Sequence, residues 1–523
     1  MEQTPAAGRY GRPSSITSQD ILDENASTKG PRRSRGGMKR KTILLLVFGV
    51  CAIAAAAVAY LVTRKGDDAT DASNESGGSG NGGSTSGGKS SSGTSTSKGS
   101  GTSTGTGSSG ASKVTTDPTA EKYPLTAFAI GDWGATTYSV NGSCCSRRHG
   151  VYNAYDRHSE VGVSKLMALE AANGKPAVVL SHGDNFYWDG MHGEKDMEYR
   201  FQLTFEDHHG EESMMDVPWL NVMGNHDYGG ASFVCQDSEE AATECKSTDA
   251  LISALKDKFD WQAKYTSPNN NRWILKDHFY KYSIEKDGVT MDIFNLDTND
   301  ADVHGADQVC CQCYGYAEGD DDDCNSVTRG HKYCCGGDTG MWDKCMALFK
   351  SWGDDSKKQL LEEAKKSTAT WKIVNTHYSA YGHYGEQGAK EWMEALEGAG
   401  IQLWIAGHTH GEKHDYASFN MHFIENGAGG GIQSEPASGI PKYVESTVSN
   451  IWSAGGIGDG NTYGFFALDA SETWLKARYM TFDDKWSITK DDDGLEKGTI
   501  GGVAAKHCWY IPVDGAKGQE CEA

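Results

Sequence analysis

Six residues of metal-binding type each stand at the end of a short apolar run. They are Asp132, Asp184, Asn225, His377, His408 and His410. Carboxylate, amide and imidazole ligands suit iron, manganese, zinc or magnesium, and none of the six is a thiol although the chain contains 14 cysteines. A single Gly-Asp or Gly-His-Thr-His is more often a polar turn, but the ordered series GDWG, GDNFY, GNHD, His377 and GHTH predicts a two-metal site. Paired ions of this kind hold the attacking and leaving oxygens of an in-line displacement.

The apolar runs before these residues have the length of strands that are buried on both faces. The runs are LTAFAIGD (125–132), AVVLSHGD (177–184), WLNVMGNHD (219–227), MDIFNLD (291–297), WKIVNTH (371–377) and IQLWIAGHTH (401–410). Helical patterns alternate with several of them, at Glu160–Ala172, Asp249–Phe259, Lys357–Lys366 and Ala389–Glu397. This alternation predicts an α/β fold, in which functional groups gather at the carboxyl ends of the strands.

The succession of motifs resembles the metallophosphoesterase superfamily and, within it, the purple acid phosphatases. Members of the superfamily usually begin with Asp-x-His, but here Gly134 stands where that histidine would be. Purple acid phosphatases use instead the Tyr of Gly-Asp-x-x-Tyr, which Tyr187 matches. The stretches 201–227, 295–298, 425–430 and 464–469 resemble the small tartrate-resistant, mammalian-type branch. The resemblance covers about residues 124–480 apart from an insert, and it implies a four-layer α/β/β/α sandwich.

The same resemblance implies a dinuclear centre of a ferric ion and a divalent ion, which would be Fe, Zn or Mn. The implied ferric ligands are Asp132, Asp184, Tyr187 and His410. Asp184 would bridge to the divalent ion, whose other ligands would be Asn225, His377 and His408. The implied activity is that of an acid phosphatase, in which a metal-bound hydroxide attacks a phosphate monoester in line. A phosphodiesterase or nucleotide pyrophosphatase on the same scaffold, a redox role, and a non-enzymatic display or binding module stay open.

Three further residues are candidates for catalysis at this centre. His226 in GNHD and His383 in the loop after His377 are expected to bind phosphate and to protonate the leaving group. Asp227 is expected to orient His226 by accepting its ring N–H. The aromatic residues Trp133, Phe186 and Trp188 either line the cleft or pack in the core.

The amino-terminal region predicts a membrane anchor. Ile43 to Val62 are twenty residues without a charge, enough to span a bilayer as a helix, and six Lys or Arg precede them within ten residues. The positive-inside rule places the basic tail 1–41 in the cytoplasm, the anchor 42–63 in the membrane and all that follows outside or in a lumen. A cleaved signal peptide is the alternative, which the long hydrophilic lead disfavours. The sequence therefore predicts a single-pass type II membrane protein of the secretory pathway.

A linker and an acidic catalytic domain follow the predicted anchor. The linker, residues 64–121, is flexible by composition, since 33 of the 37 residues from Ser76 to Ser112 are Gly, Ser or Thr. Sequons at Asn74 and Asn141 predict a glycoprotein. Residues 1–65 carry 11 Lys/Arg against 4 Asp/Glu, so the net charge of −23 divides into +7 there and −30 elsewhere. An acidic body of this kind is not expected to bind nucleic acid.

The catalytic domain is expected over 122–490, with an extension at 491–523 and a cysteine-rich insert at 299–350. Seven cysteines crowd the insert, namely Cys310, Cys311, Cys313, Cys324, Cys334, Cys335 and Cys345. Disulfides are favoured over a zinc cluster, because the spacing lacks paired Cys-x-x-Cys and the predicted compartment is oxidising. The acidic run 320–323 lacks the spacing of a calcium loop, which makes calcium binding the lesser alternative. The insert is expected to form a stapled lid or a substrate-selecting wall.

The expected partners are small phosphorylated substrates or phosphoproteins, and the membrane through one helix. With thirteen cysteines outside the anchor, at least one is unpaired or intermolecular. The sequence specifies neither the physiological substrate nor the oligomeric state.

Overall fold

The computed structural model describes residues 117–135, 147–148, 151–237, 242–317, 324, 327–454, 463–490 and 496–522. All of them belong to a compact unit formed by residues 106–523. Within these ranges no helix combines the length and the apolar character needed to cross a bilayer. The predicted anchor 42–63, nearly all of the linker and both sequons lie outside the described residues.

Two mixed sheets form the centre of the described structure. Across the first sheet run β21 (Gln519–Glu520), β20 (Val503–Pro512), β17 (Trp474–Phe482), β16 (Gly464–Ala470), β1 (Leu125–Ile130), β4 (Val178–Ser181), β5 (Trp219–Asn221) and β8 (Trp273–Ile274). Across the second run β15 (Val448–Ser453), β13 (Glu412–Ala417), β14 (Met421–Asn426), β12 (Leu403–Ala406), β11 (Trp371–Thr376), β10 (Val289–Leu296) and β9 (Phe279–Lys286). Strands β1, β4 and β5 are parallel neighbours, as are β10, β11, β12 and β14. The predicted strands are thus confirmed in place.

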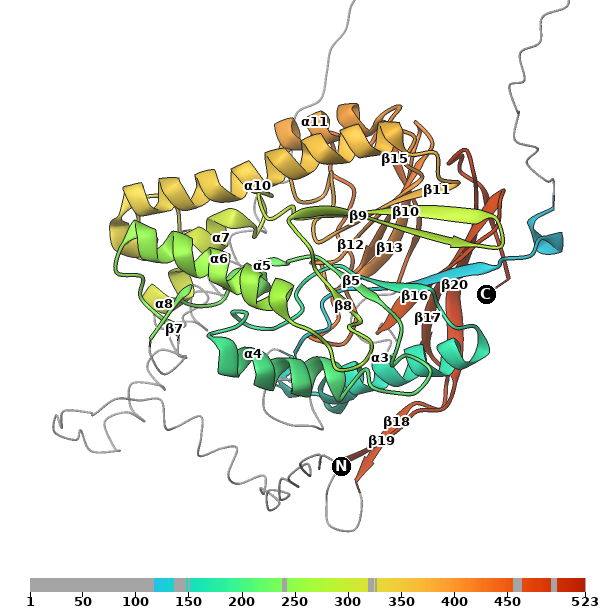
Figure 1. Cartoon of the computed structure of the whole chain (residues 1–523), viewed down its shortest axis with the longest axis horizontal. Helices are drawn as coiled ribbons and strands as arrows, with labels where there is room; N and C mark the ends of the chain where they lie inside the picture. Colours follow the sequence, from blue (N-terminus) through green and yellow to red (C-terminus); the bar gives the residue numbers. More distant parts are fainter. Residues whose placement is uncertain are drawn as a thin grey trace, which may run out of the picture. The chain divides into compact units, whose positions relative to one another are not determined.

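Helices cover the outer face of each sheet (Figure 1). Helices α3 (Ala154–Asn173) and α4 (Glu194–Arg200) lie on one side, and α10 (Thr339–Lys366) and α11 (Glu386–Leu396) on the other. Val163 and Leu166 of α3 pack with Phe128 of β1, whereas Trp392 of α11 packs with Trp404 of β12. The chain therefore has the α/β/β/α layering that the family resemblance implied.

Strand β1 shows why the strands read as continuous apolar runs. Ala127 and Ala129 belong to the cluster that fills the space between the two sheets, together with Ile373 of β11. Phe128 and Ile130 alternate with them and pack under α3. Side chains on both faces of the strand are buried, so both faces must be apolar.

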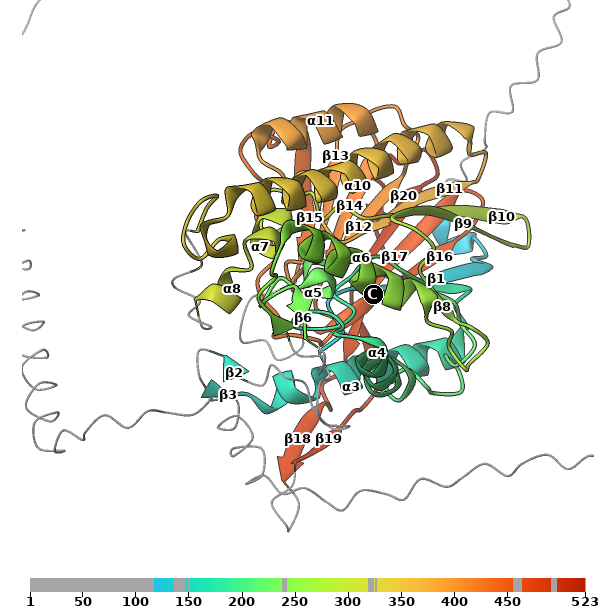
Figure 2. The same ribbon diagram turned by 60° about the vertical axis from the view of Figure 1, so that its left-hand side comes forward.

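The shorter elements lie around this sandwich. They are β2 (Arg147–Arg148), β3 (Val151–Tyr152), β6 (Cys235–Gln236), β7 (Ala242–Thr243), β18 (Ser487–Lys490), β19 (Glu496–Thr499), α5 (Asn225–Tyr228), α6 (Thr248–Lys264), α7 (Ala306–Cys311), α8 (Cys313–Tyr316), 3-10 turns at Pro118–Ala120 and Cys335–Gly337, and a π-helical turn at Phe201–Glu206. Figure 2 shows the β18–β19 hairpin projecting beyond α3.

The carboxyl-terminal residues differ from the expected separate extension. Strand β20 pairs along its length with β17 inside the first sheet, and the Cys508–Cys521 disulfide joins β20 to the segment after β21. Tyr510 and Ile511 of this strand are buried. The sandwich thus includes residues 503–522.

Disulfides hold the cysteine-rich insert, as the sequence predicted. Among the described cysteines, the insert contains the pairs Cys310–Cys345, Cys311–Cys334 and Cys313–Cys324. Cys335 keeps a free thiol, which is buried and donates to the carbonyl of Cys310 at 2.8 Å. A further pair outside the insert, Cys235–Cys245, closes the loop between β6 and β7. With six of the seven insert cysteines paired, the insert keeps one thiol, which is too few for the alternative zinc cluster. The acidic run 320–323 lies outside the described residues.

Candidate metal centre

Strand ends of both sheets meet at one edge of the sandwich. Asp132 and Asp184 follow the parallel strands β1 and β4, and Asn225 opens α5 after β5. His377 follows β11, and the loop after its parallel neighbour β12 carries His408 and His410. Parallel strands place their carboxyl ends at the same edge, which brings residues far apart in sequence together.

One group of predicted ligands surrounds Asp132. Ligand atoms of Asp132, Asp184 and His410 all lie within 4.8 Å of one another. The Tyr187 hydroxyl lies 3.1 Å from Asp132 Oδ1 and 3.4 Å from His410 Nε2. These are the four residues for which the resemblance implied a ferric ion.

The other predicted ligands lie on the far side of Asp184. His377 Nε2 is 3.1 Å from Asn225 Oδ1 and 3.5 Å from Asp184 Oδ1. The His408 ring lies 5.2 Å from the His377 ring, centroid to centroid. His377 Nδ1 donates to the carbonyl of His182 at 2.7 Å, which turns the lone pair of Nε2 toward Asn225 and Asp184. His182 was not singled out in the sequence, because a backbone carbonyl partner leaves no residue-type signal.

Backbone conformation aims these side chains. Asp132, Asp184, His408 and His410 all have positive φ, between 50° and 74°. The left-handed region is uncommon for residues other than glycine, although Asp and His enter it more readily than most. Such residues turn the chain sharply at the strand end, so the side chain points across the edge of the sheets.

Two glycines allow the close approach of the strand-end loops. A Cβ at Gly224 would lie 2.1 Å from Asp184 Oδ1, and one at Gly407 would lie 2.3 Å from Asp132 Oδ2. Real Cβ atoms do not approach other heavy atoms so closely. Glycine at these positions is therefore required by the two carboxylates.

The donor set fits a cationic group. Asp184 Oδ2 and His408 Nδ1 are buried and have no hydrogen-bond partner among the described residues. Burial, and then the nearby Asp184, raise the pKa of Asp132 well above its ordinary value. Burial and the two carboxylates likewise raise the pKa of Tyr187 far above 10. Burial lowers the pKa of His408, which keeps its imidazole neutral as a metal ligand must be. Two buried carboxylates side by side need positive charge nearby, which metal ions would supply.

Asp227 has a different role from the predicted one. Its carboxylate accepts backbone N–H bonds from Gly224 at 2.8 Å, from Asn185 at 3.0 Å and from Phe186 at 3.1 Å. His226 Nδ1 donates instead to the carbonyl of Trp188, and the His226 backbone N–H donates to Asp184 Oδ1 at 3.0 Å. The expectation that Asp227 orients the His226 ring was wrong, because its oxygens are occupied by the strand-end loops.

His383 lies beside His408. Its ring centroid is 4.8 Å from that of His408, and the ring is buried. The backbone N–H of Ser379 donates to His383 Nδ1 at 2.9 Å, which places the ring proton of the neutral form on Nε2. Burial lowers the pKa of His383 to about 4.

A buried ionic cluster supports the loop that carries His408 and His410. Lys413 Nζ lies 2.8 Å from Glu425 Oε1 and 3.2 Å from Asp415 Oδ2. The other oxygen of Glu425 accepts from the Thr409 hydroxyl at 2.9 Å. Thr409 stands between the two histidines, so this cluster fixes the turn from β12 to β13.

The three aromatic residues divide between core and rim. Trp133 and Phe186 are fully buried in the cluster under α3, which settles them as core residues. Trp188 is 38% exposed, and its ring lies 5.3 Å from that of His226. Only Trp188 of the three borders the site.

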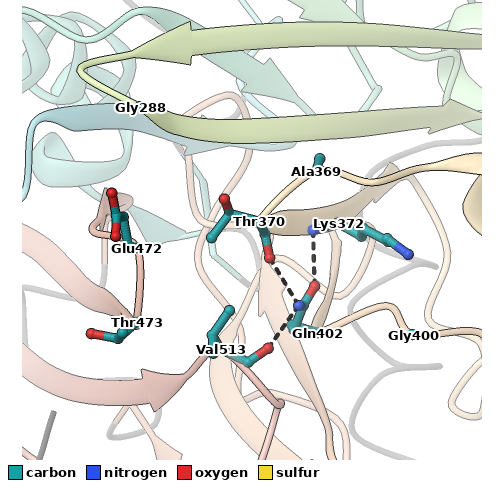
Figure 3. A pocket seen from close by; sticks show the side chains of 9 residues that line it. All are labelled: Gly288, Ala369, Thr370, Lys372, Gly400, Gln402, Glu472, Thr473 and Val513. Carbon is teal, nitrogen blue, oxygen red and sulfur yellow. Dashed lines mark hydrogen bonds between the residues drawn. The ribbon is translucent and has the colours of Figure 1, made fainter. Parts of the chain in front are cut away.

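A hollow of about 580 Å³ lies at the opposite ends of the strands (Figure 3). Gly288, Lys372 and Gln402 line it, at the amino ends of β10, β11 and β12. Gln402 uses its amide on the protein itself, accepting from the Lys372 N–H at 2.8 Å and donating to Thr370 and Val513 carbonyls. This hollow takes no part in the metal centre.

Comparison with known proteins agrees with the fold. Residues 125–412 match the calcineurin-like phosphoesterase family, and the chain belongs to that family. It is 31% identical over 193 residues to tartrate-resistant acid phosphatase type 5 of Sus scrofa, covering 36% of this chain and 44% of that protein. It is 24% identical over 309 residues to purple acid phosphatase 7 of Arabidopsis thaliana, covering 58% of this chain and 70% of that protein. The chain is thus homologous to the tartrate-resistant and purple acid phosphatases, although it spans less than half the length of the first of these relatives.

A solved structure with a related fold is described as GAP50, the anchor in the inner membrane complex of Plasmodium. The TM-score is 0.43 and the sequence identity 16%, over 69% of this chain and 85% of that one.

Proposed function

We propose that the protein is an acid phosphatase that hydrolyses phosphate monoesters at a dinuclear centre of Fe(III) and a divalent Fe, Zn or Mn ion. The observation that carries this proposal is the meeting of the predicted ligands at one edge of the two sheets. Asp132, Tyr187 and His410 lie on one side of Asp184, and His377 with Asn225 on the other. A phenol beside two carboxylates favours a trivalent ion, whereas imidazole and amide groups favour a divalent one.

The bound metals would supply activation of water and charge neutralisation at the phosphoryl group. Asp132, Asp184, Tyr187 and His410 would hold the ferric ion, and Asp184, Asn225, His377 and His408 the divalent one. As a ligand of the ferric ion, the Tyr187 hydroxyl would have to lose its proton, and burial and the two carboxylates raise its pKa well above 10 without the charge of the ions.

His226 and His383 complete the site around the substrate. His383 presents an Nε2–H while Nδ1 accepts from Ser379, so it donates a hydrogen bond to the phosphate without needing to be charged. His226 donates from Nδ1 to the Trp188 carbonyl, so its Nε2 would carry a proton for the leaving oxygen only while the ring is doubly protonated. Its aromatic neighbours Tyr187 and Trp188 fix the ring, with centroids at 4.6 Å and 5.3 Å.

The catalytic unit belongs to the secretory pathway or the cell exterior, as five disulfides among the described residues indicate. We further propose that residues 42–63 anchor it as a type II membrane protein and that Asn74 and Asn141 carry glycans. Phosphorylated small molecules or phosphoproteins would be its substrates.

The test compares hydrolysis of a chromogenic phosphate monoester with that of the matching diester at mildly acidic pH. We expect a strong monoester preference, and we expect Asn225→Ala to lose most of the activity together with one metal ion per chain. Asn173→Ala, at an exposed position that ends α3, is the matched control and should behave as the parent. A diester preference would assign the protein to the alternative phosphodiesterase class, and no turnover by the metal-loaded protein would refute the enzymatic proposal.

A further inference from the structure

His304 stands at the corner where the disulfide-bonded insert leaves strand β10. Its side chain is exposed, and its ring centroid lies 5.9 Å from that of His408, with the ring planes at 64°. The ring nitrogens make no hydrogen bond to any residue that the structure describes. An imidazole free to bind a ligand therefore borders the predicted metal centre, and the sequence motifs had not singled it out.

The backbone around His304 is fixed by residues of the site itself. The Tyr378 hydroxyl donates to the His304 carbonyl at 2.9 Å, and Tyr378 directly follows the predicted ligand His377. The N–H groups of Asp302 and Val303 both donate to the carbonyl of His383 at 3.0 Å. The backbone at His304 is thus tied to the residue next to His377 and to His383 itself.

Covalent links stiffen the segment on the other side of His304. Helix α7 begins after Gly305, and disulfides join its Cys310 to Cys345 of α10 and its Cys311 to Cys334. The N–H groups of Gln308 and Val309 donate to the Gly305 carbonyl and close the first turn. Because the backbone is held on both sides of His304, this residue has little freedom to move away from the site.

We propose that His304 contacts the substrate and donates an imidazole N–H to an oxygen of its phosphate group. This inference rests on the proposed phosphatase function and adds a third histidine donor, supplied by the insert, to His226 and His383. It also assigns the insert a direct part in substrate binding, since the corner 302–305 forms one wall of the site.

The test uses the full-length, metal-loaded protein and the variant His304→Asn, because asparagine tolerates the left-handed backbone at this position, where φ is 53°. Asparagine has a shorter reach, so we expect KM for a phosphate monoester and the inhibition constant of inorganic phosphate both to rise about tenfold. The kcat and the metal content should stay close to those of the parent protein. His304→Gln, which keeps a donor near the Nε2 position, should recover part of the affinity.

His331→Gln is the matched control, because His331 is an exposed histidine of the same insert whose contacts are with Tyr333. If the inhibition constant of phosphate for His304→Asn equals that of the parent protein, the proposal is overturned, whatever happens to KM. A loss of metal from His304→Asn would also overturn it. Calorimetric binding of inorganic phosphate tests His304 even if the parent protein turns over no ester. If the parent protein hydrolyses no ester but His304→Asn binds phosphate more weakly than the parent does, the proposed function is rejected and the contact between His304 and phosphate is supported.

Discussion

Two neighbouring residues of one motif have separate tasks. His226 faces the centre through its ring and binds the loop at the Trp188 carbonyl, whereas Asp227 points away and accepts backbone donors from Gly224, Asn185 and Phe186. Gln262 Nε2 of α6 adds a further bond to Asp227 Oδ1 at 2.9 Å. Both residues lie in the same motif, so only the direction of each side chain separates a ring at the site from a carboxylate that holds the loops.

We predict that Asp227→Asn and His226→Asn have opposite signatures. The amide in Asp227→Asn replaces one acceptor oxygen by a donor, which leaves buried N–H groups poorly paired and lowers the free energy of unfolding by about 1–3 kcal/mol. His226→Asn should keep the unfolding free energy close to that of the parent but lower kcat by about 10²-fold or more, as expected for loss of a proton donor. Urea unfolding and monoester kinetics measure the two effects, and a stable Asp227→Asn protein with low kcat would contradict this division of roles.

At the scale of elements, loops rather than strands make the site. Helix α5 is a single turn, yet it places Asn225 and His226 because Gly224 lets the loop rest on Asp184. The contact leaves no room for a side chain, since a Cβ would meet Asp184 Oδ1 at 2.1 Å. The site therefore depends on the packing of loop against loop as much as on its ligands.

Gly224→Ala is expected to remove metal without altering any ligand. The added methyl must push Asp184 away from its place between the two groups of predicted ligands, so metal content and turnover should both fall sharply. Gly174→Ala is the control, because Gly174 has an extended backbone and no atom within 4 Å of its Cβ position. The metal content of the purified variants tests this prediction. Full metal occupancy in Gly224→Ala would contradict it and would show that the loop can move to make room for the methyl group.

At the scale of the whole molecule, a chain of buried histidines joins the two sheets. His414 of β13 lies between His507 of β20 at 2.9 Å and His422 of β14 at 2.8 Å, nitrogen to nitrogen. His422 Nε2 donates to the Ala516 carbonyl at 3.0 Å. With that bond fixed, neutral His422 accepts at Nδ1 from His414 Nε2–H, and neutral His414 accepts at Nδ1 from His507 Nε2–H.

This chain predicts a loss of stability in acid. Burial lowers the pKa of His422 and of His507 to about 4 in the folded protein, against about 6.5 when unfolded. Between these values the unfolded state binds more protons, so the free energy of unfolding falls as the pH drops from about 6.5 to about 4. Each histidine contributes a slope of up to about 1.4 kcal/mol per pH unit.

Unfolding in urea at several pH values measures this slope. His507→Gln should flatten it relative to the parent, whereas His331→Gln, at an exposed position, should leave it unchanged. If the unfolding free energy changes with pH by the same slope in all three proteins, then buried carboxylates, and not this chain of histidines, cause the loss of stability in acid.

The strands, the main helices, the layering and the identity of the clustered residues followed from the sequence alone. Apolar runs that end in Asp132, Asp184, His377 or His408 are local patterns, and burial on both faces requires them. The four helices predicted from their patterns are present as α3, α6, α10 and α11. Disulfides in the insert also followed from composition, although their pairing did not.

Tertiary structure alone decided what depends on contacts between distant segments. The role of Asp227, the placing of His304 beside His408, the inclusion of β20 in the first sheet and the histidine chain between the sheets all arise from residues distant in sequence. Residue types and spacing indicate which groups can react and which can be buried. They do not record which backbone donor meets a carboxylate or which loop folds over a strand end, because packing sets those distances and no local pattern carries them.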